Sequence, residues 1–320
     1  MKVLVKFSME NPELAYAEFL RLIKPESFKQ SGRYGIATIH KSNLKLLPKL
    51  AYTKSVYEIL FTSEICNLKR KTAEYNWVKV CKNSYKIQVK GLPDKYKKDL
   101  TDIIYYSIKN SKTSKPMVNL KTPATQILFN ELDKKIITGK LIYLNKEKFM
   151  ERRSHLRPVP HPTSLHPKLA RCLVNLTALS KGTVTDPFCG TGGILIEAGL
   201  AGFKIIGIDI QEKMVESARI NLEYYGIKNF NLKVGDALSY NIKSDAVVTD
   251  LPYGRNSYIS TRPEQLVQKF LNNIYKLTDK AVIVVPDSIK FACNKWGIVG
   301  RYSYYIHKSL TRIIYVLEKY

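Results

Sequence analysis

The sequence has few of the features that mark disulfide-stapled, membrane or metal-binding proteins. Its five cysteines are odd in number and never form a C-x-x-C pair, so neither a disulfide framework nor a zinc site built from neighbouring cysteines is predicted. The five histidines show no ligand spacing: His161 and His166 lie in a proline-rich stretch without a carboxylate or thiol nearby. We therefore expect no bound metal and a reducing compartment.

Long apolar runs are also missing from the sequence. No stretch approaches the roughly 18 residues that a membrane span needs, and the N-terminus alternates lysine with apolar residues where a signal peptide would have a continuous apolar core. With 45% hydrophobic and 25% charged residues, the chain has ample material for packed cores. We expect a soluble, cytoplasmic protein of two or so domains that does not contact a membrane.

Acidic residues are scarce in this chain. There are 27 Asp plus Glu against 52 Lys plus Arg, which gives a net charge of +25, divided into +18 over residues 1–160 and +7 over residues 161–320. This asymmetry favours a first half that holds a polyanion such as RNA. Tyrosines interleaved with lysine, as in Lys95-Tyr96-Lys97, could stack on bases. The alternative, that the lysines only solvate the surface, stays open.

The first half predicts α+β structure without catalytic features. Hydrophobic spacing predicts strands at 2–9, 34–40 and 55–61 and helices at 12–23 and 43–50. Further along we expect alternation over 77–89, a helix over 95–109, and strands near 117–120, 124–130 and 141–144. Neither part has a glycine-rich phosphate loop or a cluster of acid and base side chains, so binding is predicted here.

A proline-rich segment divides the chain. Residues 151–167 contain three Arg, three His and four Pro, which cannot continue a helix or a central strand. After it, apolar stretches alternate with helical patterns, which predicts βαβ crossovers and a parallel sheet. The expected strands are 183–186, 204–209, 230–235, 245–250 and 281–286, with a terminal hairpin over 298–306 and 312–317.

Acidic residues stand at the ends of four predicted strands: Asp186, Asp209, Asp236 and Asp250. In an open parallel sheet, ligands bind beyond the carboxyl ends of the strands. Asp186 opens the loop DPFCGTGG, whose glycines allow close approach of a ligand. Asp209 is suited to ribose hydroxyls and Asp236 to an adenine amine. This layout predicts a nucleoside cofactor.

The glycine loop has two other interpretations. A dinucleotide site would have G-x-G-x-x-G, and this loop lacks the third glycine in register. Asp186 would repel a pyrophosphate but suits a cationic cofactor such as S-adenosylmethionine. A nicotinamide dehydrogenase and a purely structural turn remain as alternatives.

The fourth strand end, Asp250-Leu251-Pro252-Tyr253-Gly254, predicts a site for an aromatic amine. The Asp250 carboxylate and the Leu251 carbonyl could accept the two hydrogens of a base amine and aim its lone pair at a methyl group. Pro252 restrains the Leu251 backbone. Tyr253 would stack on the base. The alternative is an ordinary strand-to-turn sequence.

On these motifs, residues 165–320 resemble a class I S-adenosylmethionine-dependent methyltransferase with a Rossmann-like α/β fold. RPVPHPTSLHPKLAR, DPFCGTGGILIEAG and DLPYGR, in this order, are similar to the archaeal tRNA (guanosine-10, N2)-methyltransferase family. VNLKTP and GKLIYL resemble, loosely, part of a THUMP domain. The resemblance implies a ferredoxin-like segment at 1–62, a THUMP RNA-binding domain at 63–150, a linker at 151–164 and the methyltransferase domain at 165–320.

The resemblance also implies the activity and the residues that carry it. It implies a tRNA substrate and formation of N2-methylguanosine and N2,N2-dimethylguanosine by a monomer, and leaves open an activating partner subunit. Asp250, Leu251, Pro252 and Tyr253 would hold the target guanine. The residues expected around the cofactor are Pro162, Thr163, His166, Asp186, Phe188, Gly190, Gly192, Asp209, Ile210, Asp236, Ala237 and Asp250.

The sequence departs from the family pattern at one position and leaves other reactions open. Leu251 stands where many relatives have proline, which removes stiffness but keeps the carbonyl. Cys189 is expected to fill space in the cofactor loop, because no cysteine accompanies DLPYG to support covalent pyrimidine methylation. A methyltransferase for rRNA guanine N2 or adenine N6, and a non-catalytic RNA-binding protein, are the other candidates.

Overall fold

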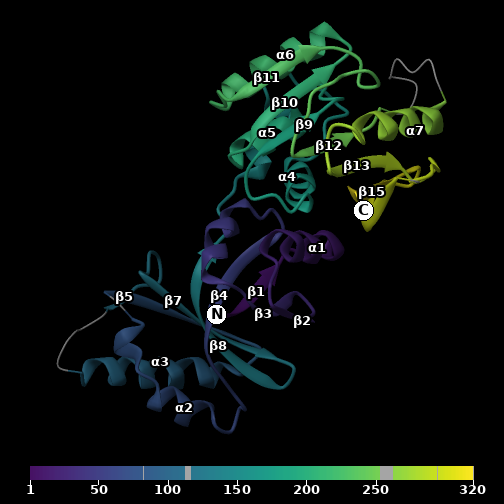
Figure 1. Cartoon of the computed structure of the whole chain (residues 1–320). Helices are drawn as coiled ribbons and strands as arrows, with labels where there is room; N and C mark the ends of the chain where they lie inside the picture. Colours follow the sequence, from purple (N-terminus) through teal and green to yellow (C-terminus); the bar gives the residue numbers. More distant parts are fainter. Residues whose placement is uncertain (82, 112–116, 253–261, 294, 320) are drawn as a thin grey trace. The chain divides into compact units, whose positions relative to one another are not determined.

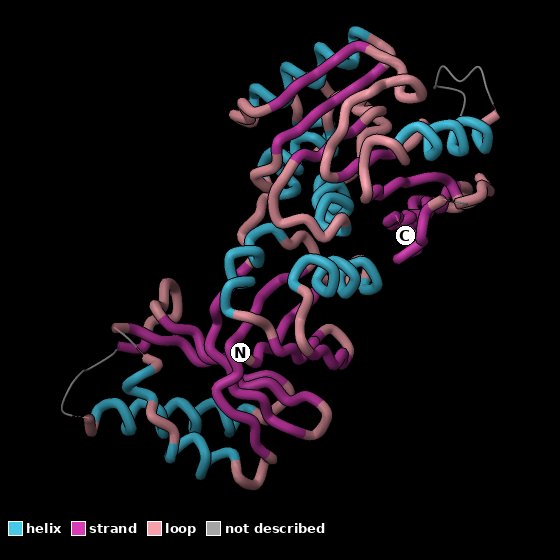
Figure 2. The backbone as a smooth tube through the Cα atoms, in the orientation of Figure 1, coloured by secondary structure: helices cyan, strands magenta, loops and turns pink. Residues whose placement is uncertain are grey.

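The computed structural model describes residues 1–81, 83–111, 117–252, 262–293 and 295–319, which form two compact units. The first unit consists of Met1–Pro12, Ile23–Pro48 and Thr53–Asn145, and the second of Glu13–Leu22, Lys49–Tyr52 and Lys146–Tyr320. Figure 1 labels most of the helices and strands of both units, and Figure 2 colours them by type. The chain therefore enters the second unit twice before it reaches the methyltransferase-like half of the sequence.

One continuous eight-stranded sheet runs through the first unit. Strand β4 (Thr53–Ser63) pairs antiparallel with both β1 (Lys2–Phe7) and β8 (Lys135–Leu144), which joins the parts that the sequence suggested as two small folds. The strand order is β2-β3-β1-β4-β8-β7-β5-β6. The remaining strands are β2 (Ser27–Ser31), β3 (Tyr34–Thr38), β5 (Ser84–Lys90), β6 (Met117–Val118) and β7 (Thr125–Leu132).

Helix α3 (Asp94–Lys109) covers the β5 and β7 part of this sheet. Its buried residues Leu100, Ile104 and Ile108 are spaced four apart and form a single apolar face. They pack in one cluster with Trp77 and Phe129, both fully buried. Helix α2 (Leu68–Glu74) joins this layer through Leu68.

Most of the elements predicted in the first half are present, but several differ from the structure, including β8, which begins at Lys135 and not near 141. The helix expected at 43–50 is a 3₁₀ helix, Lys41–Lys49, because Pro48 lies within it and has no backbone N–H to donate. The alternation over 77–89 becomes a strand only at Ser84, after a 3₁₀ turn at Trp77–Lys79. Strand β2 and helix α2 were not predicted, because one is a polar edge strand and the other is short and charged.

The second unit contains a seven-stranded sheet in the order β11-β10-β9-β12-β13-β15-β14. Its parallel strands are β9 (Thr183–Asp186), β10 (Lys204–Asp209), β11 (Phe230–Val234), β12 (Ala246–Asp250) and β13 (Lys280–Pro286). The hairpin of β14 (Trp296–His307) and β15 (Leu310–Lys319) adds antiparallel to β13. Helices α4 (Pro167–Leu176), α5 (Gly193–Leu200), α6 (Glu212–Tyr224) and α7 (Pro263–Ile274) connect them. The predicted Rossmann-like α/β fold is confirmed.

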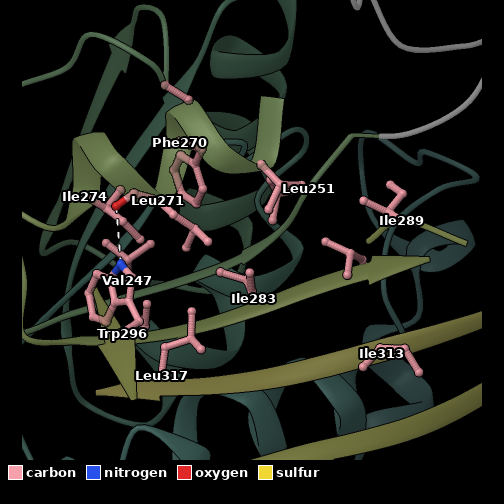
Figure 3. Close-up of a cluster of buried hydrophobic side chains, with 14 residues drawn as sticks. Val247, Leu251, Phe270, Leu271, Ile274, Ile283, Ile289, Trp296, Ile313 and Leu317 are labelled. Atoms are coloured by element: carbon pink, nitrogen blue, oxygen red, sulfur yellow. Dashed lines mark hydrogen bonds between the residues drawn. The ribbon is translucent and has the colours of Figure 1, made fainter. Parts of the chain in front are cut away.

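Helix α7 is held on this sheet by a cluster of buried apolar side chains (Figure 3). The odd-numbered residues of β13 that join it, Ala281, Ile283 and Val285, alternate with neighbours that point to the other face of the sheet. Phe270 of α7 is fully buried in the cluster, and the indole N–H of Trp296 donates to the Leu271 carbonyl at 3.3 Å. This packing fixes the sheet at the carboxyl end of β12.

Helix α1 (Pro12–Ile23) packs in the second unit although it lies early in the sequence. Glu18 is fully buried, and its carboxylate accepts hydrogen bonds from the backbone N–H groups of Ala51 and Tyr52 and from Asn175 Nδ2 on α4, at 2.7 to 2.8 Å. Arg21 pairs with Glu318 on β15. These contacts make α1 part of the body that carries the parallel sheet.

A buried ion-pair network joins the segment after residue 146 to the same body. Glu197 of α5 is fully buried between Arg152, at 2.7 Å from its Oε1, and Arg171, at 3.0 Å from its Oε2. Arg152 also reaches Glu147 at 2.8 Å. Because each charge has an opposite charge in contact, the network is satisfied only when all three segments are docked.

No helix in the described ranges of the chain combines the length and the apolar character needed to cross a bilayer.

Replacement of Phe270 by Ala should lower the free energy of unfolding by about 3 to 5 kcal/mol, because it empties a fully buried aromatic site. The measurement is urea unfolding followed by Trp296 fluorescence in a Trp77→Phe background, where the second unit carries the remaining tryptophan. The control is Leu200→Ala, an exposed apolar residue of α5, with an expected effect within about 0.5 kcal/mol. Equal effects of the two substitutions would contradict the role given to this cluster.

Candidate active site at the strand ends

The four acids predicted from the sequence lie at one edge of the second sheet. Strands β11, β10, β9 and β12 are consecutive and parallel, and their register pairs Gly207 with Asp186 and Asp209 with Val234. Asp186, Asp209 and Asp250 are the last residues of their strands, and Asp236 follows β11 by two residues. The structure therefore brings together acids that span more than sixty positions of sequence.

Asp186 is the most buried of these acids. It is 2% exposed, and its Oδ1 accepts hydrogen bonds from the Phe188 N–H at 3.2 Å and from the Thr249 hydroxyl at 2.6 Å. Burial raises the pKa of Asp186 to about 7, and the neighbouring carboxylates Asp209 and Asp250 add to the rise. Thr249, which the sequence did not single out, ties the loop after β9 to the end of β12.

Asp209 holds the glycine loop in place. Its Oδ2 accepts from the Gly190 N–H at 2.9 Å, and its Oδ1 accepts from the Gln211 N–H at 3.0 Å. Gly190 has φ +49°, and a Cβ added there would meet no atom within 4 Å, so this part of the loop borders open space. Gly192 has φ +83°, and an added Cβ would lie 3.3 Å from the Ala218 Cβ on α6. The loop needs glycine at both positions, for backbone conformation in each case and for helix contact in the second.

The predicted adenine end of the site combines exposed and buried residues. Ile210 is 64% exposed directly after Asp209, and Asp236 is exposed with its Oδ1 accepting from the Leu238 N–H. Ala237 is buried in the α7 cluster. An exposed isoleucine beside two carboxylates offers an apolar contact for a flat ring.

Phe188 points toward the protein interior more than the sequence suggested. Its ring packs edge-on against Phe270 with centroids 5.3 Å apart, as part of the α7 cluster. The phenyl group therefore anchors the loop, and the neighbouring backbone is left to approach a ligand.

The segment before α4 is fixed against the glycine loop. The Ser164 and Thr191 hydroxyls lie 3.1 Å apart, and the fully buried Asn221 donates to both the Thr191 and Val159 carbonyls at 3.0 Å. His166 caps α4 by accepting from the Lys168 N–H.

Pro162 and Thr163 are exposed next to this junction, and the Thr163 hydroxyl lies 2.8 Å from the His161 ring. Residues 151–164, which the sequence predicted to be a linker, carry parts of two 3₁₀ helices, Phe149–Arg152 and Ser154–Leu156. The role of Asn221 in holding the glycine loop could not be predicted from the sequence, because asparagine is common on helices.

Asp250 ends β12 beside Asp186, with its two oxygens in different surroundings. Oδ2 lies 3.3 Å from the Arg312 guanidinium, and Oδ1 is buried without a hydrogen-bond partner among the described residues. Burial raises the pKa of Asp250 to about 7, and Arg312 opposes that rise. Arg312 lies in β15, and nothing in its local sequence links it to Asp250.

The backbone at Leu251 is held by its surroundings, although the residue is not the proline of the family pattern expected from the sequence. Its side chain is 2% exposed within the α7 cluster (Figure 3). Its N–H donates to the Val284 carbonyl at 3.1 Å. Packing and a strand hydrogen bond therefore fix its backbone. Pro252 is half-buried next to it, and Tyr253 lies outside the described residues.

Cys189 is a packing group in this loop. It is 5% exposed, and burial raises the pKa of its thiol well above the usual range, which opposes formation of a thiolate nucleophile. Across the part of the chain that is described, no cluster of three or more His, Cys, Asp or Glu could hold a metal ion.

Asp186→Asn should stabilise the protein at pH 8 by about 1 to 3 kcal/mol and change stability little at pH 4. The pKa of an unfolded aspartate is about 3.9, and the pKa of folded Asp186 is about 7. Between these two values the folded state holds a proton that the unfolded state has lost. The free energy of unfolding therefore falls as the pH rises through that window. Melting temperatures across pH 4 to 9 measure this. A stabilisation that does not change with pH would contradict the assignment.

Comparison with known proteins agrees with this geometry. Residues 154–295 match a family described as the RMKL-like methyltransferase domain, and residues 27–219 match a family described as DNA methylase. The solved structure of TrmN from Thermus thermophilus has a TM-score of 0.54 at 16% identity, with all of both chains covered, and supports the fold.

Curated relatives are more specific. The chain is 37% identical over 339 residues, the whole length of both proteins, to tRNA (guanine(10)-N2)-dimethyltransferase of Methanothermobacter thermautotrophicus. It is 37% identical over 220 residues to the protein of the same name from Pyrococcus abyssi, covering 63% of this chain and 64% of the relative. The full-length match spans both units, and the chain belongs to the tRNA (guanine(10)-N2)-dimethyltransferase family.

Proposed function

We propose that this protein transfers methyl groups from S-adenosylmethionine to the exocyclic N2 of guanosine 10 in tRNA, giving N2-methylguanosine and N2,N2-dimethylguanosine. The observation that carries this proposal is the buried Oδ1 of Asp250 at the end of β12, next to the glycine loop, which has no hydrogen-bond partner among the described residues. The name of the full-length relative supplies the tRNA position and the second methyl group.

The residues at the sheet edge fit the cofactor. Asp186, Asp209 and Asp236 present negative charge to a cationic ligand, and the open space beside Gly190 leaves room for it. Each carboxylate also accepts a hydrogen bond from a backbone N–H, those of Phe188, Gly190 and Leu238 respectively, so the acids are positioned before a ligand arrives. Thr163, His166 and Ile210 border the same region in our proposal, and Pro162 and Ala237 complete it.

Asp250 and Leu251 would act on the guanine amine. S-adenosylmethionine supplies an activated methyl group on a sulfonium when it is bound. The N2 lone pair of guanine is delocalised into the ring, so the amine must be held with its hydrogens on acceptors and its lone pair toward the methyl carbon. Oδ1 of Asp250 is one acceptor and the Leu251 carbonyl the other. Methyl transfer would form the N2–carbon bond and break the carbon–sulfur bond, which leaves N2 positive. The Asp250 carboxylate would stabilise that charge and accept the proton that N2 then loses.

The first unit would hold the tRNA. It carries most of the charge excess of residues 1–160, and α3 has exposed lysines at Lys95, Lys98 and Lys109 on one helical face with Tyr105 and Tyr106. Its sheet with two helices fits our proposal of a THUMP domain at 63–150, following a ferredoxin-like segment at 1–62. Because the substrate is tRNA, we propose a cytoplasmic protein, and we keep a monomer as the working state.

Methylation of an adenine N6 is the second candidate. The match of residues 27–219 to a DNA methylase family favours it, since an adenine amine could use the same two acceptors. The nucleoside product distinguishes the two candidates.

Asp250→Ala should reduce methyl transfer by about 100- to 1,000-fold or more, because the amine loses its charged acceptor. Binding of S-adenosylmethionine and of tRNA should stay near normal. Transfer is measured with labelled cofactor and an unmodified tRNA transcript, followed by nucleoside mass spectrometry. The control variant is Asp279→Ala, an exposed aspartate at the opposite edge of the sheet.

The matching control substrate is a transcript in which guanosine 10 is replaced by adenosine. It should yield no N2-methylguanosine. Turnover of Asp250→Ala at the normal rate would exclude the mechanism, and N6-methyladenosine as the product would favour the second candidate.

The triple substitution Lys95→Gln, Lys98→Gln and Lys109→Gln should weaken tRNA binding and lower the salt slope by about 1 for each lysine that contacts a phosphate. The measurement is tRNA affinity across a range of salt concentrations. The control, Lys213→Gln with Lys228→Gln and Lys233→Gln, removes the same charge from exposed sites on the second unit. Point substitutions are preferable to removal of residues 1–150, since that would remove α1 and expose its docking site on α4. Equal slopes for both triple variants would contradict the division of roles.

A further inference from the structure

Among the described residues, Arg312 is the cation that contacts Asp250, the acid that is central to the proposed reaction. Its guanidinium lies 3.3 Å from Oδ2 of Asp250, and both side chains are largely buried, 11% and 17% exposed. Arg312 lies opposite Pro286 of β13 and Tyr304 of β14, so its backbone is held between two neighbouring strands. The pair therefore joins the last hairpin to the end of β12.

The two oxygens of the Asp250 carboxylate have different surroundings in this pair. Oδ2 is occupied by Arg312, whereas Oδ1 is buried and has no hydrogen-bond partner among the described residues. A buried acceptor without a partner is costly unless a ligand supplies the hydrogen. The N–H of a nucleobase amine would supply it.

We propose that Arg312 is a positioning residue of the methyl-transfer site, which holds Oδ2 of Asp250 so that Oδ1 faces the amine of the target base. This inference rests on the proposed function for the identity of the amine.

Arg312 favours the ionised form of Asp250, whereas the other surroundings of Asp250 disfavour a negative charge there. From β9, the neighbouring Asp186 carboxylate disfavours a second negative charge close by, and the α7 cluster beside Leu251 is apolar. From β15, Arg312 acts in the opposite direction and lowers the pKa of Asp250 against the effect of burial. Among the described residues, no other cation is found to oppose that rise. Loss of Arg312 would therefore leave Asp250 protonated over a wider pH range, and a protonated Oδ1 cannot accept from the amine.

Arg312→Gln should move the acidic limb of the pH–rate profile to higher pH. If the pKa of Asp250 rises by one unit, the ionised fraction falls about tenfold on the acidic side, so methyl transfer at pH 6 should fall about tenfold or more and recover toward pH 9. Single-turnover rates with saturating tRNA and labelled cofactor report this change, with little effect expected on tRNA affinity. Arg312→Lys keeps the charge and should restore the position of the limb.

The control variant is Arg301→Gln, which removes an exposed arginine from the adjacent strand β14. Its pH–rate profile should match that of the unmodified protein. An unchanged acidic limb in Arg312→Gln, or a loss of rate that is the same at every pH, would overturn the positioning role.

A stability measurement separates this inference from the proposed function. At pH 8, the Asp250→Asn substitution should raise the melting temperature more in the Arg312→Gln background than in the unmodified protein, because the ionised carboxylate then lacks its cation. This double-mutant cycle needs no enzymatic activity. Additive effects in the cycle would refute the pair. Failure of the unmodified protein to methylate tRNA, together with a coupled cycle, would refute the substrate and leave the pair intact.

Discussion

The buried carboxylate of Asp186 is the interaction on which the architecture of the site depends. Burying an acid in an apolar interior is unfavourable, and here the Phe188 N–H and the Thr249 hydroxyl offset part of that cost. The same two hydrogen bonds connect the start of the glycine loop to the end of β12. The strand that carries Asp250 and the loop beside Gly190 are thus held in register by one side chain. A cationic ligand would complete the compensation that the protein leaves partial.

Much of this site could be predicted from the sequence, because its main determinants are local. The acids at the ends of β9, β10 and β12 follow short apolar strands, so their positions along the chain also predicted their position in the sheet. The glycine loop combines a conformational requirement at Gly190 with a packing requirement at Gly192, and both leave a visible pattern. The parallel strands of the second half were predicted to within one residue of their ends.

The features that the sequence did not predict depend on contacts between distant segments. Arg312 is separated from Asp250 by sixty-two positions, and an arginine within a β-strand carries no signal of its partner. The continuous sheet of the first unit arises because β4 is long enough to pair on both sides, and strand length alone does not predict a second partner. The assignment of α1 to the second unit depends on Glu18, whose hydrogen-bond partners lie 33 to 157 positions away.

The docking of α1 has a consequence for how the protein is made on the ribosome. Glu18 and the 49–52 segment are synthesised early, but Asn175 and the rest of α4 follow roughly 120 residues later, a delay of about 6 to 25 s at ordinary elongation rates. During that interval the apolar face of α1 has no helix to cover it, and the Glu18 carboxylate remains hydrated. The sheet of the first unit can form meanwhile, since none of its strands comes from beyond residue 145. The nascent chain thus passes through a state in which α1 has been synthesised and its partner α4 has not.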